Sequence, residues 1–109
     1  MAASRLLDAA RSVVDEINGL ADRARPPLIE ERQLRAAADS IAANVRESNG
    51  RRSDAERKQF FRYALGSAEE TDERLRTNFA SRRIAAATYW RIHNRLVVIR
   101  KMLERLLAR

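Results

Sequence analysis

The 109-residue sequence contains no cysteine, only three glycines and only two prolines. Without cysteine it can form neither a disulfide framework nor a thiolate metal site. So few glycines and prolines leave room for few turns, which predicts a small number of long elements. No apolar run approaches the roughly 20 residues that a membrane-spanning helix needs. Charges at Arg5, Asp8 and Arg11 are unlike a signal peptide, so we expect a cytoplasmic protein.

Basic charge is concentrated in the second half of the chain, which has a net charge of +7 overall. Residues 1–48 carry seven Arg against eight Asp or Glu, whereas residues 49–109 carry fifteen Arg or Lys against seven Asp or Glu. In residues 82–109 the only acidic side chain is Glu104. Such a segment indicates an anionic partner such as nucleic acid, or it forms only a solvated helix face. Charge alone leaves both interpretations open.

Apolar residues recur at helical spacing in four segments, 3–24, 28–48, 54–79 and 84–108. Heptad seams run along the first and last segments, comprising Leu6, Ala10, Val13, Ile17, Leu20 and Ala24 in the first and Tyr89, Ile92, Leu96, Ile99, Leu103 and Leu106 in the last. No β-hairpin signal competes with this pattern. Four amphipathic helices with short connections predict an all-α, antiparallel up-down four-helix bundle, with residues 1–109 as a single domain.

The connections between these helices carry recognisable signals. Pro26-Pro27 ends the first helix and is compatible with the start of the second. Gly50 is expected to end the second helix in the left-handed conformation. Ser53 and Glu56 have the spacing of a capping box, which predicts the start of the third helix. Gly66 in the middle of that helix costs about 1 kcal/mol of helix propensity, so we expect it to allow close helix approach.

Polar residues beside the apolar faces of the second and third helices raise the question of a site. Antiparallel packing is expected to let Asn44 and Glu47 hydrogen-bond with Ser67 and Glu70, or with Arg51. A satisfied network of this kind fixes the register of two helices. Glu47 and Glu70 could alternatively be paired carboxylates for acid–base chemistry or a metal. We favour the structural role for this motif.

Features that would indicate an enzyme are scarce. His93 is the only histidine, and its neighbours by helical spacing include no carboxylate. The Glu-x-x-His pattern of metal-binding bundles is missing, as are a glycine-rich phosphate loop and a nucleophile motif. We therefore expect no catalytic residue, no metal and no cofactor.

The last helix has a second face, on which arginines surround Val98 and Met102. These two residues either flank the core or form a subunit contact. Aromatic residues that could stack on bases are few, and we expect most of them in the core: Phe60, Tyr63, Tyr89 and Trp90. The candidate phosphate contacts are basic residues of the last helix and of the connections that follow the second and third helices: Arg51, Arg52, Arg82, Arg83, Arg91, Arg95, Arg100, Lys101 and Arg105.

The stretch from Gln33 to Ser53 resembles the signature QLRRAAxSIPxNIAEGxGRxS of the 23S rRNA intervening-sequence four-helix-bundle family. The segment from Gly66 to Glu70 matches the GSxxE pattern of that family. The resemblance covers about residues 28–108 and preserves the spacing between the two motifs. The sequence departs from the signature at Ala42, Arg46 and Ser48, as expected of a divergent member.

The family resemblance implies an antiparallel four-helix bundle that assembles into a homopentamer with a basic surface. The related accessory variability protein (Avd) of diversity-generating retroelements binds nucleic acid and a reverse transcriptase. We therefore expect a non-enzymatic, oligomeric protein that binds RNA or DNA through phosphate contacts, as an accessory to a reverse transcriptase. The alternative is a protein-interaction scaffold whose arginines keep it soluble or meet an acidic partner.

Overall fold

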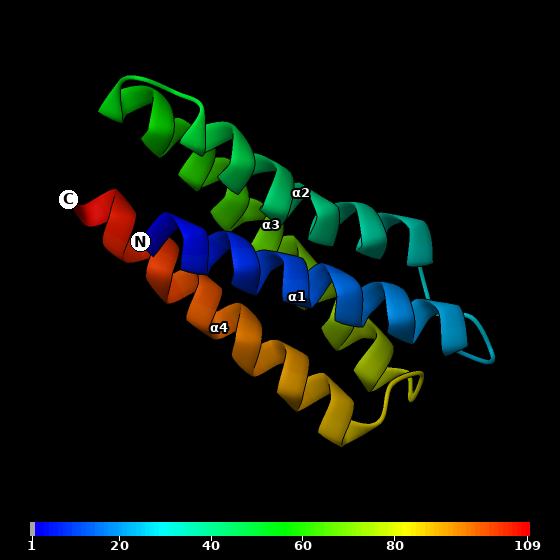
Figure 1. The fold of residues 1–109 in the computed structure, drawn as a ribbon. Coiled ribbons are helices and arrows are strands. Elements are labelled where there is room, and N and C mark those ends of the chain that lie inside the picture. Colours follow the sequence, from blue (N-terminus) through cyan, green and yellow to red (C-terminus); the bar gives the residue numbers. More distant parts are fainter. Residues whose placement is uncertain (1) are drawn as a thin grey trace.

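The computed structural model describes residues 2–109, with side chains from residue 5 onward, and consists of four helices. They are α1 (Ala2–Arg23), α2 (Glu31–Asn49), α3 (Asp54–Ala80) and α4 (Ala86–Ala108). They run up and down in an elongated bundle with extents of 45 × 20 × 19 Å (Figure 1). Within the described chain, each helix packs against two neighbours, and no Cα atoms of the diagonal pairs α1–α3 and α2–α4 approach within 8 Å. The predicted all-α four-helix bundle is confirmed.

Both chain ends and the α2–α3 turn lie at one end of the bundle, and the α1–α2 and α3–α4 connections lie at the other (Figure 1). We call these the terminal end and the loop end. The contact between Lys58 Nζ and the carbonyl oxygen of Arg109, 2.8 Å apart, ties the start of α3 to the C-terminus at the terminal end. No helix in residues 2–109 has the length and apolar character needed to span a membrane.

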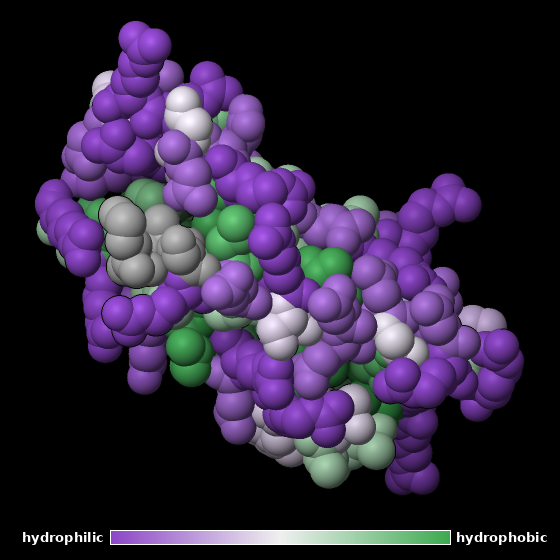
Figure 2. All heavy atoms as spheres, viewed as in Figure 1, coloured by the Kyte–Doolittle hydropathy of each residue, from purple (hydrophilic) through white to green (hydrophobic). Residues whose placement is uncertain are grey.

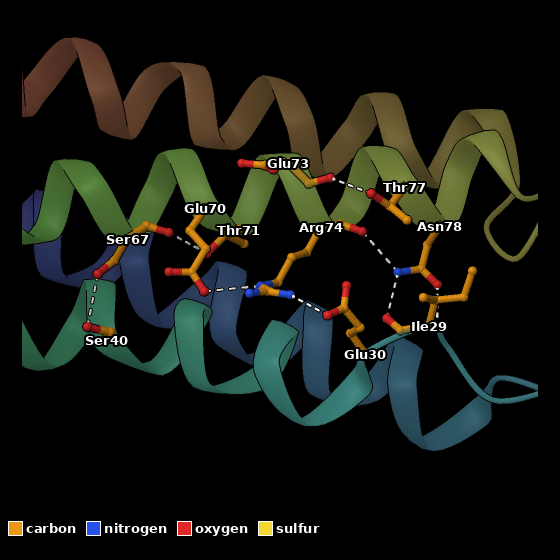
Figure 3. Close-up of polar contacts among 10 residues, drawn as sticks. All are labelled: Ile29, Glu30, Ser40, Ser67, Glu70, Thr71, Glu73, Arg74, Thr77 and Asn78. Carbon is orange, nitrogen blue, oxygen red and sulfur yellow. Dashed lines mark hydrogen bonds and ion pairs between the residues drawn. The ribbon is translucent and has the colours of Figure 1, made fainter.

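The second helix begins at Glu31, three residues later than the sequence predicts. Leu28 is buried instead as part of the connection, and Glu30 adopts the left-handed conformation with φ 51°. The side-chain amide of Asn78 binds the backbone of Ile29, accepting from its N–H at 2.7 Å and donating to its carbonyl at 3.1 Å (Figure 3). These contacts hold residues 28–30 in a non-helical turn, although the local sequence permits a helix.

The fourth helix likewise begins late, at Ala86 rather than residue 84. Ile84 is buried with 4% exposure, and Arg82 adopts the left-handed conformation with φ 60°. At the α2–α3 turn the expected left-handed glycine is wrong: Gly50 has φ −88° and is right-handed. In the last turn of α2, the Gly50 N–H donates to the carbonyl of Glu47, three residues earlier. The residues directly after Gly50 are not helical.

The core consists mainly of the predicted apolar seams. The apolar residues at helical spacing in α2 are buried: Leu34, Ala37, Ala38, Ile41, Ala42 and Val45. The α4 seam is buried from Tyr89 to Leu103, and Leu106 is partly buried. In α1 the seam holds from Leu6 to Ile17, but burial then passes to Ala21, leaving Leu20 and Ala24 only partly buried. A straight helix drifts by about 20° per heptad against a 3.5-residue repeat, which moves the buried line by one position.

Candidate nucleic-acid interface

The α2–α3 hairpin carries the polar motif that the sequence singles out. Ser53 caps α3, since its hydroxyl accepts a hydrogen bond from the Glu56 N–H at 3.1 Å. The Glu56 carboxylate reaches back to the Ser53 hydroxyl rather than to its backbone N–H. The first half of the predicted capping box is therefore confirmed, and the reciprocal half takes a different partner.

The predicted polar contacts between α2 and α3 run through a residue that the sequence did not single out. The hydroxyl of Ser67 donates to Ser40 Oγ at 2.9 Å (Figure 3). Asn44 Nδ2 donates to the same Ser40 hydroxyl at 3.0 Å. The direct Asn44–Ser67 contact is thus replaced by a relay through Ser40. Glu47 pairs with Arg51 at 3.1 Å, one of the two partners expected for it.

Glu70 lies farther along α3 and pairs with Arg74 at 3.0 Å, not with Asn44 or Glu47. Arg74 also reaches Glu30 of the α1–α2 connection at 3.2 Å (Figure 3). The hydrogen bond that Arg74 donates to Glu70, reinforced by the charge of Glu30, raises the pKa of the Arg74 guanidinium, which stays charged. Glu70 therefore stabilises the hairpin through Arg74 and is not part of a carboxylate pair.

Gly66 has a different environment from the one expected. The residue is exposed, and a Cβ atom added to it would meet nothing within 4 Å. The prediction that Gly66 allows α2 to approach α3 closely is therefore wrong for the helices of a single chain. The neighbouring Ser67 contacts α2 instead, through its 2.9 Å hydrogen bond to Ser40.

The nine candidate phosphate contacts do not form one patch. Arg51 and Arg52 lie at the α2–α3 turn, at the terminal end, and Arg105 lies in the last turn of α4 at that same end (Figure 1). Arg82 and Arg83 follow α3 at the loop end (Figure 1). The other four lie along α4 between the two ends.

Several of these basic side chains already have partners within the chain. Arg91 Nε lies 3.2 Å from Glu16, and Arg95 approaches the same carboxylate at 3.7 Å while donating to Ser12 at 2.7 Å. These contacts join α4 to α1. Arg83 donates to the Pro27 carbonyl at 2.7 Å across the loop end.

The guanidinium of Arg51 lies 4.7 Å from the centroid of the Phe60 ring, in addition to its pairing with Glu47. Arg100 has a weak acidic neighbour, Glu69, at 4.0 Å. Both arginines are therefore held in place while part of each side chain stays exposed.

Four of the nine candidates have no hydrogen bond or ion pair from their side chains within residues 5–109: Arg52, Arg82, Lys101 and Arg105. All four are exposed. Arg105 also lines a cavity of about 170 Å³ at the terminal end, together with Arg5, Met102, Leu106 and Arg109. Lys101 and Arg105 leave the last half of α4 with two cations available to an external anion.

The predicted subunit-contact residues differ in exposure. Val98 is 54% exposed, and Met102 packs partly against the core. Val98 borders a hollow of about 180 Å³ that it shares with Ala9, Ser12 and Arg95. An apolar side chain therefore stands exposed among the arginines of α4. Hydrophilic side chains cover most of the face shown in Figure 2, with apolar side chains visible between them.

A polar cluster that the sequence did not reveal lies between α3 and α4. His93 Nδ1 is 2.8 Å from Asp72 Oδ1, and the buried Asp72 also contacts Arg76 at 3.1 Å. Helical spacing within α4 could not find this carboxylate, because Asp72 comes from the neighbouring helix. Among residues 5–109, no group of three or more His, Asp or Glu side chains could hold a metal ion.

Comparison with known proteins finds similarity at two levels. Residues 27–105 match the family described as 23S rRNA-intervening sequence protein. The chain also resembles the crystal structure of a protein with unknown function from the S23 ribosomal protein family of Bacteroides thetaiotaomicron VPI-5482. The TM-score is 0.93 over 100% of each chain at 23% identity, which shows the fold alone. No curated protein matches the chain.

Proposed function

The chain belongs to the 23S rRNA-intervening sequence protein family, and from this premise we propose that it binds nucleic acid through phosphate contacts. The observation that carries the proposal is the pair Lys101 and Arg105, exposed on α4 without an acidic partner within residues 5–109. Arg51 and Arg52 lie at the same end of the bundle as Arg105 (Figure 1). These four side chains offer the phosphates of a nucleic acid several cations, located on α4 and at the terminal end of the bundle.

Phosphate groups suit this arrangement because the cations are mainly arginines. A guanidinium offers a planar fork of donors that matches phosphate oxygens, and it stays charged at any physiological pH. Contacts of this kind position a nucleic acid without reading its sequence. The proposed binding is therefore strong at low salt and indifferent to sequence at the phosphate-contacting positions.

Assembly into an oligomer is part of the proposal. Val98, 54% exposed, and the partly buried Met102 lie one helical turn apart on α4 and form the apolar surface that an oligomer would cover. Copies joined through Val98 and Met102 would bring several basic helices together and raise affinity with each added phosphate contact. The family resemblance adds the pentamer and the accessory role beside a reverse transcriptase.

A protein-interaction scaffold is the second candidate, and the same exposed Val98 favours it. In that role, Val98 and Met102 dock onto a partner protein, and the arginines meet acidic side chains of that partner. Copurification from lysate with and without nuclease separates the two functions. A partner retained after nuclease treatment, together with no retained nucleic acid before it, supports the scaffold.

The direct test is the double variant Lys101→Ala/Arg105→Ala in an anisotropy titration with labelled RNA and DNA oligonucleotides. We expect affinity to fall for every sequence and the log–log salt slope to shrink by about 2, since each phosphate contact contributes about 0.9. Arg32→Ala is the matched control, because Arg32 is exposed on the first turn of α2 at the loop end. Equal losses in the two proteins would contradict the proposed interface.

A further inference from the structure

Trp90 is the single tryptophan of the chain and stands 51% exposed on the first half of α4. The expectation that most aromatic candidates lie in the core holds for Tyr89, which is 3% exposed, but not for Trp90 or for Tyr63, which is 50% exposed. Trp90 therefore presents a large aromatic surface to solvent on a basic helix, where a ligand or partner can contact it.

Three aromatic rings form a column beside Trp90. Phe79 of α3 stacks on Tyr89 at 4.6 Å with an interplanar angle of 6°, and Tyr89 stacks on His93 at 5.5 Å and 23°. The indole stands nearly perpendicular to all three rings, at 72° to Phe79, 74° to Tyr89 and 87° to His93.

The centroid distances place the indole relative to the column. The Trp90 centroid is 5.1 Å from Tyr89 and 5.3 Å from His93, so it lies beside the column and not at its end. At these distances and near-perpendicular angles, the indole makes T-shaped contacts with both rings. Edge-to-face contact is favourable because the positive ring edge meets the negative face. Trp90 nevertheless remains 51% exposed, so part of its surface is left toward solvent.

Buried residues hold the rings of the column in place. The buried carboxylate of Asp72 fixes the His93 ring through the 2.8 Å contact with Nδ1. Tyr89 is locked in the core between Phe79 and His93. Since the supporting rings come from both α3 and α4, the indole is pre-organised, and a ligand that stacks on it loses little side-chain freedom.

A cation lies at the same site. Arg76 is bound to Asp72 at 3.1 Å, yet its side chain is 64% exposed. Arg76 and His93 both contact the Asp72 carboxylate, at 3.1 and 2.8 Å, which places the Arg76 guanidinium near the His93 end of the column. Asp72 thus holds an aromatic support and an exposed positive charge from a single buried position.

We infer that the exposed surface of Trp90 is a stacking platform for one unpaired nucleobase, with Arg76, held on the same Asp72 carboxylate as His93, as the cation for a nearby phosphate. The ligand class is single-stranded nucleic acid or an unpaired loop, because a base in a duplex is already stacked on both faces. Base–aromatic stacking is independent of base identity, as expected for a binder without sequence preference. The inference rests on the proposed function and specifies which form of nucleic acid it favours.

The single tryptophan makes the platform directly observable. A 12-nucleotide single strand is titrated into the protein, and a blunt duplex of the same sequence is titrated in parallel, with Trp90 fluorescence and ligand anisotropy both recorded. We expect the single strand to quench the fluorescence and the duplex to leave it nearly unchanged. Trp90→Ala should weaken single-strand binding about tenfold and duplex binding little. Tyr63→Ala, at the other strongly exposed aromatic, is the control and should change neither.

Trp90→Phe guards against a folding defect, because it keeps an aromatic ring on the column and should retain part of the single-strand affinity. Equal binding of both ligands, without quenching and without an effect of Trp90→Ala, would overturn the platform and leave phosphate binding intact. Trp90 emission that is blue-shifted and shielded from acrylamide in the free protein would also overturn it, showing the ring buried between subunits. No binding of either ligand would instead refute the proposed function itself.

Discussion

The side chain of Asn78 on α3 binds both backbone polar groups of Ile29, 49 residues earlier in the chain (Figure 3). Its amide nitrogen also donates to the Arg74 carbonyl at 2.9 Å, so the fully buried side chain has three partners. One residue therefore fixes the α1–α2 connection against α3. The start of α2 depends on this contact as much as on the residues of α2 itself.

Asn78→Ala should lower the free energy of unfolding by about 2–4 kcal/mol, because it leaves two backbone groups of Ile29 without their partner. Urea unfolding followed by circular dichroism measures the change. Asn94→Ala is the matched control, since Asn94 is exposed on α4, and we expect less than about 0.5 kcal/mol there. A similar small loss for Asn78→Ala would show that residues 28–30 are held by other contacts.

Gly66→Ala should raise the free energy of unfolding by about 0.5–1 kcal/mol, because Gly66 is in an exposed helix interior with open space around an added Cβ. Gly19→Ala should gain less, since its added methyl group meets the Arg23 guanidinium at 3.0 Å. Thermal unfolding of the two variants compares them. A loss of stability in Gly66→Ala, accompanied by dissociation of an oligomer, would reveal close approach between chains at this position.

Glu16→Gln should raise affinity for nucleic acid by about two- to fivefold at low salt, because it releases Arg91 and Arg95 from their shared carboxylate. Glu31→Gln changes the net charge equally but acts on Arg35, on α2, and is the control. Anisotropy titrations of both variants against one oligonucleotide give the comparison. An equal gain in both would indicate that only net charge matters.

Val98→Asp should shift the protein toward smaller assemblies, because a buried charge at a subunit contact is costly to desolvate. Light scattering of wild type and variant measures the mass, and the family resemblance predicts a pentamer for the wild type. Thr88→Asp places the same charge on α4 away from Val98 and should leave the mass unchanged. A wild-type mass equal to that of one chain would contradict the predicted oligomer.

The sequence predicts the bundle well because its main determinants are local. Apolar periodicity identified all four helices, and Ser53 correctly marked the start of α3. The predicted starts of α2 and α4 were early by two or three residues, since tertiary contacts hold the preceding turns. Asn78 of α3 binds the connection before α2, and Ile84 is buried in the connection before α4.

Predictions that depended on contacts between helices succeeded less well. The polar motif is present, but its relay passes through Ser40, and Gly66 faces open space. The Asp72–His93 pair and the ring column also join two helices, so no spacing within one helix could show them. The nine candidate phosphate contacts could be chosen by charge, but the acidic partner of Arg91 and Arg95 comes from α1 and depends on the packing of α1 against α4.

The measurement that tests the central claim most directly is a titration of the wild-type protein against a labelled oligonucleotide at a series of salt concentrations. Phosphate binding predicts tight association at about 50 mM salt and a linear fall of log affinity with log salt, with a slope of about −0.9 or −0.7 per phosphate on double or single strands. Affinity that is absent at low salt, or that does not change with salt, would contradict the proposed function.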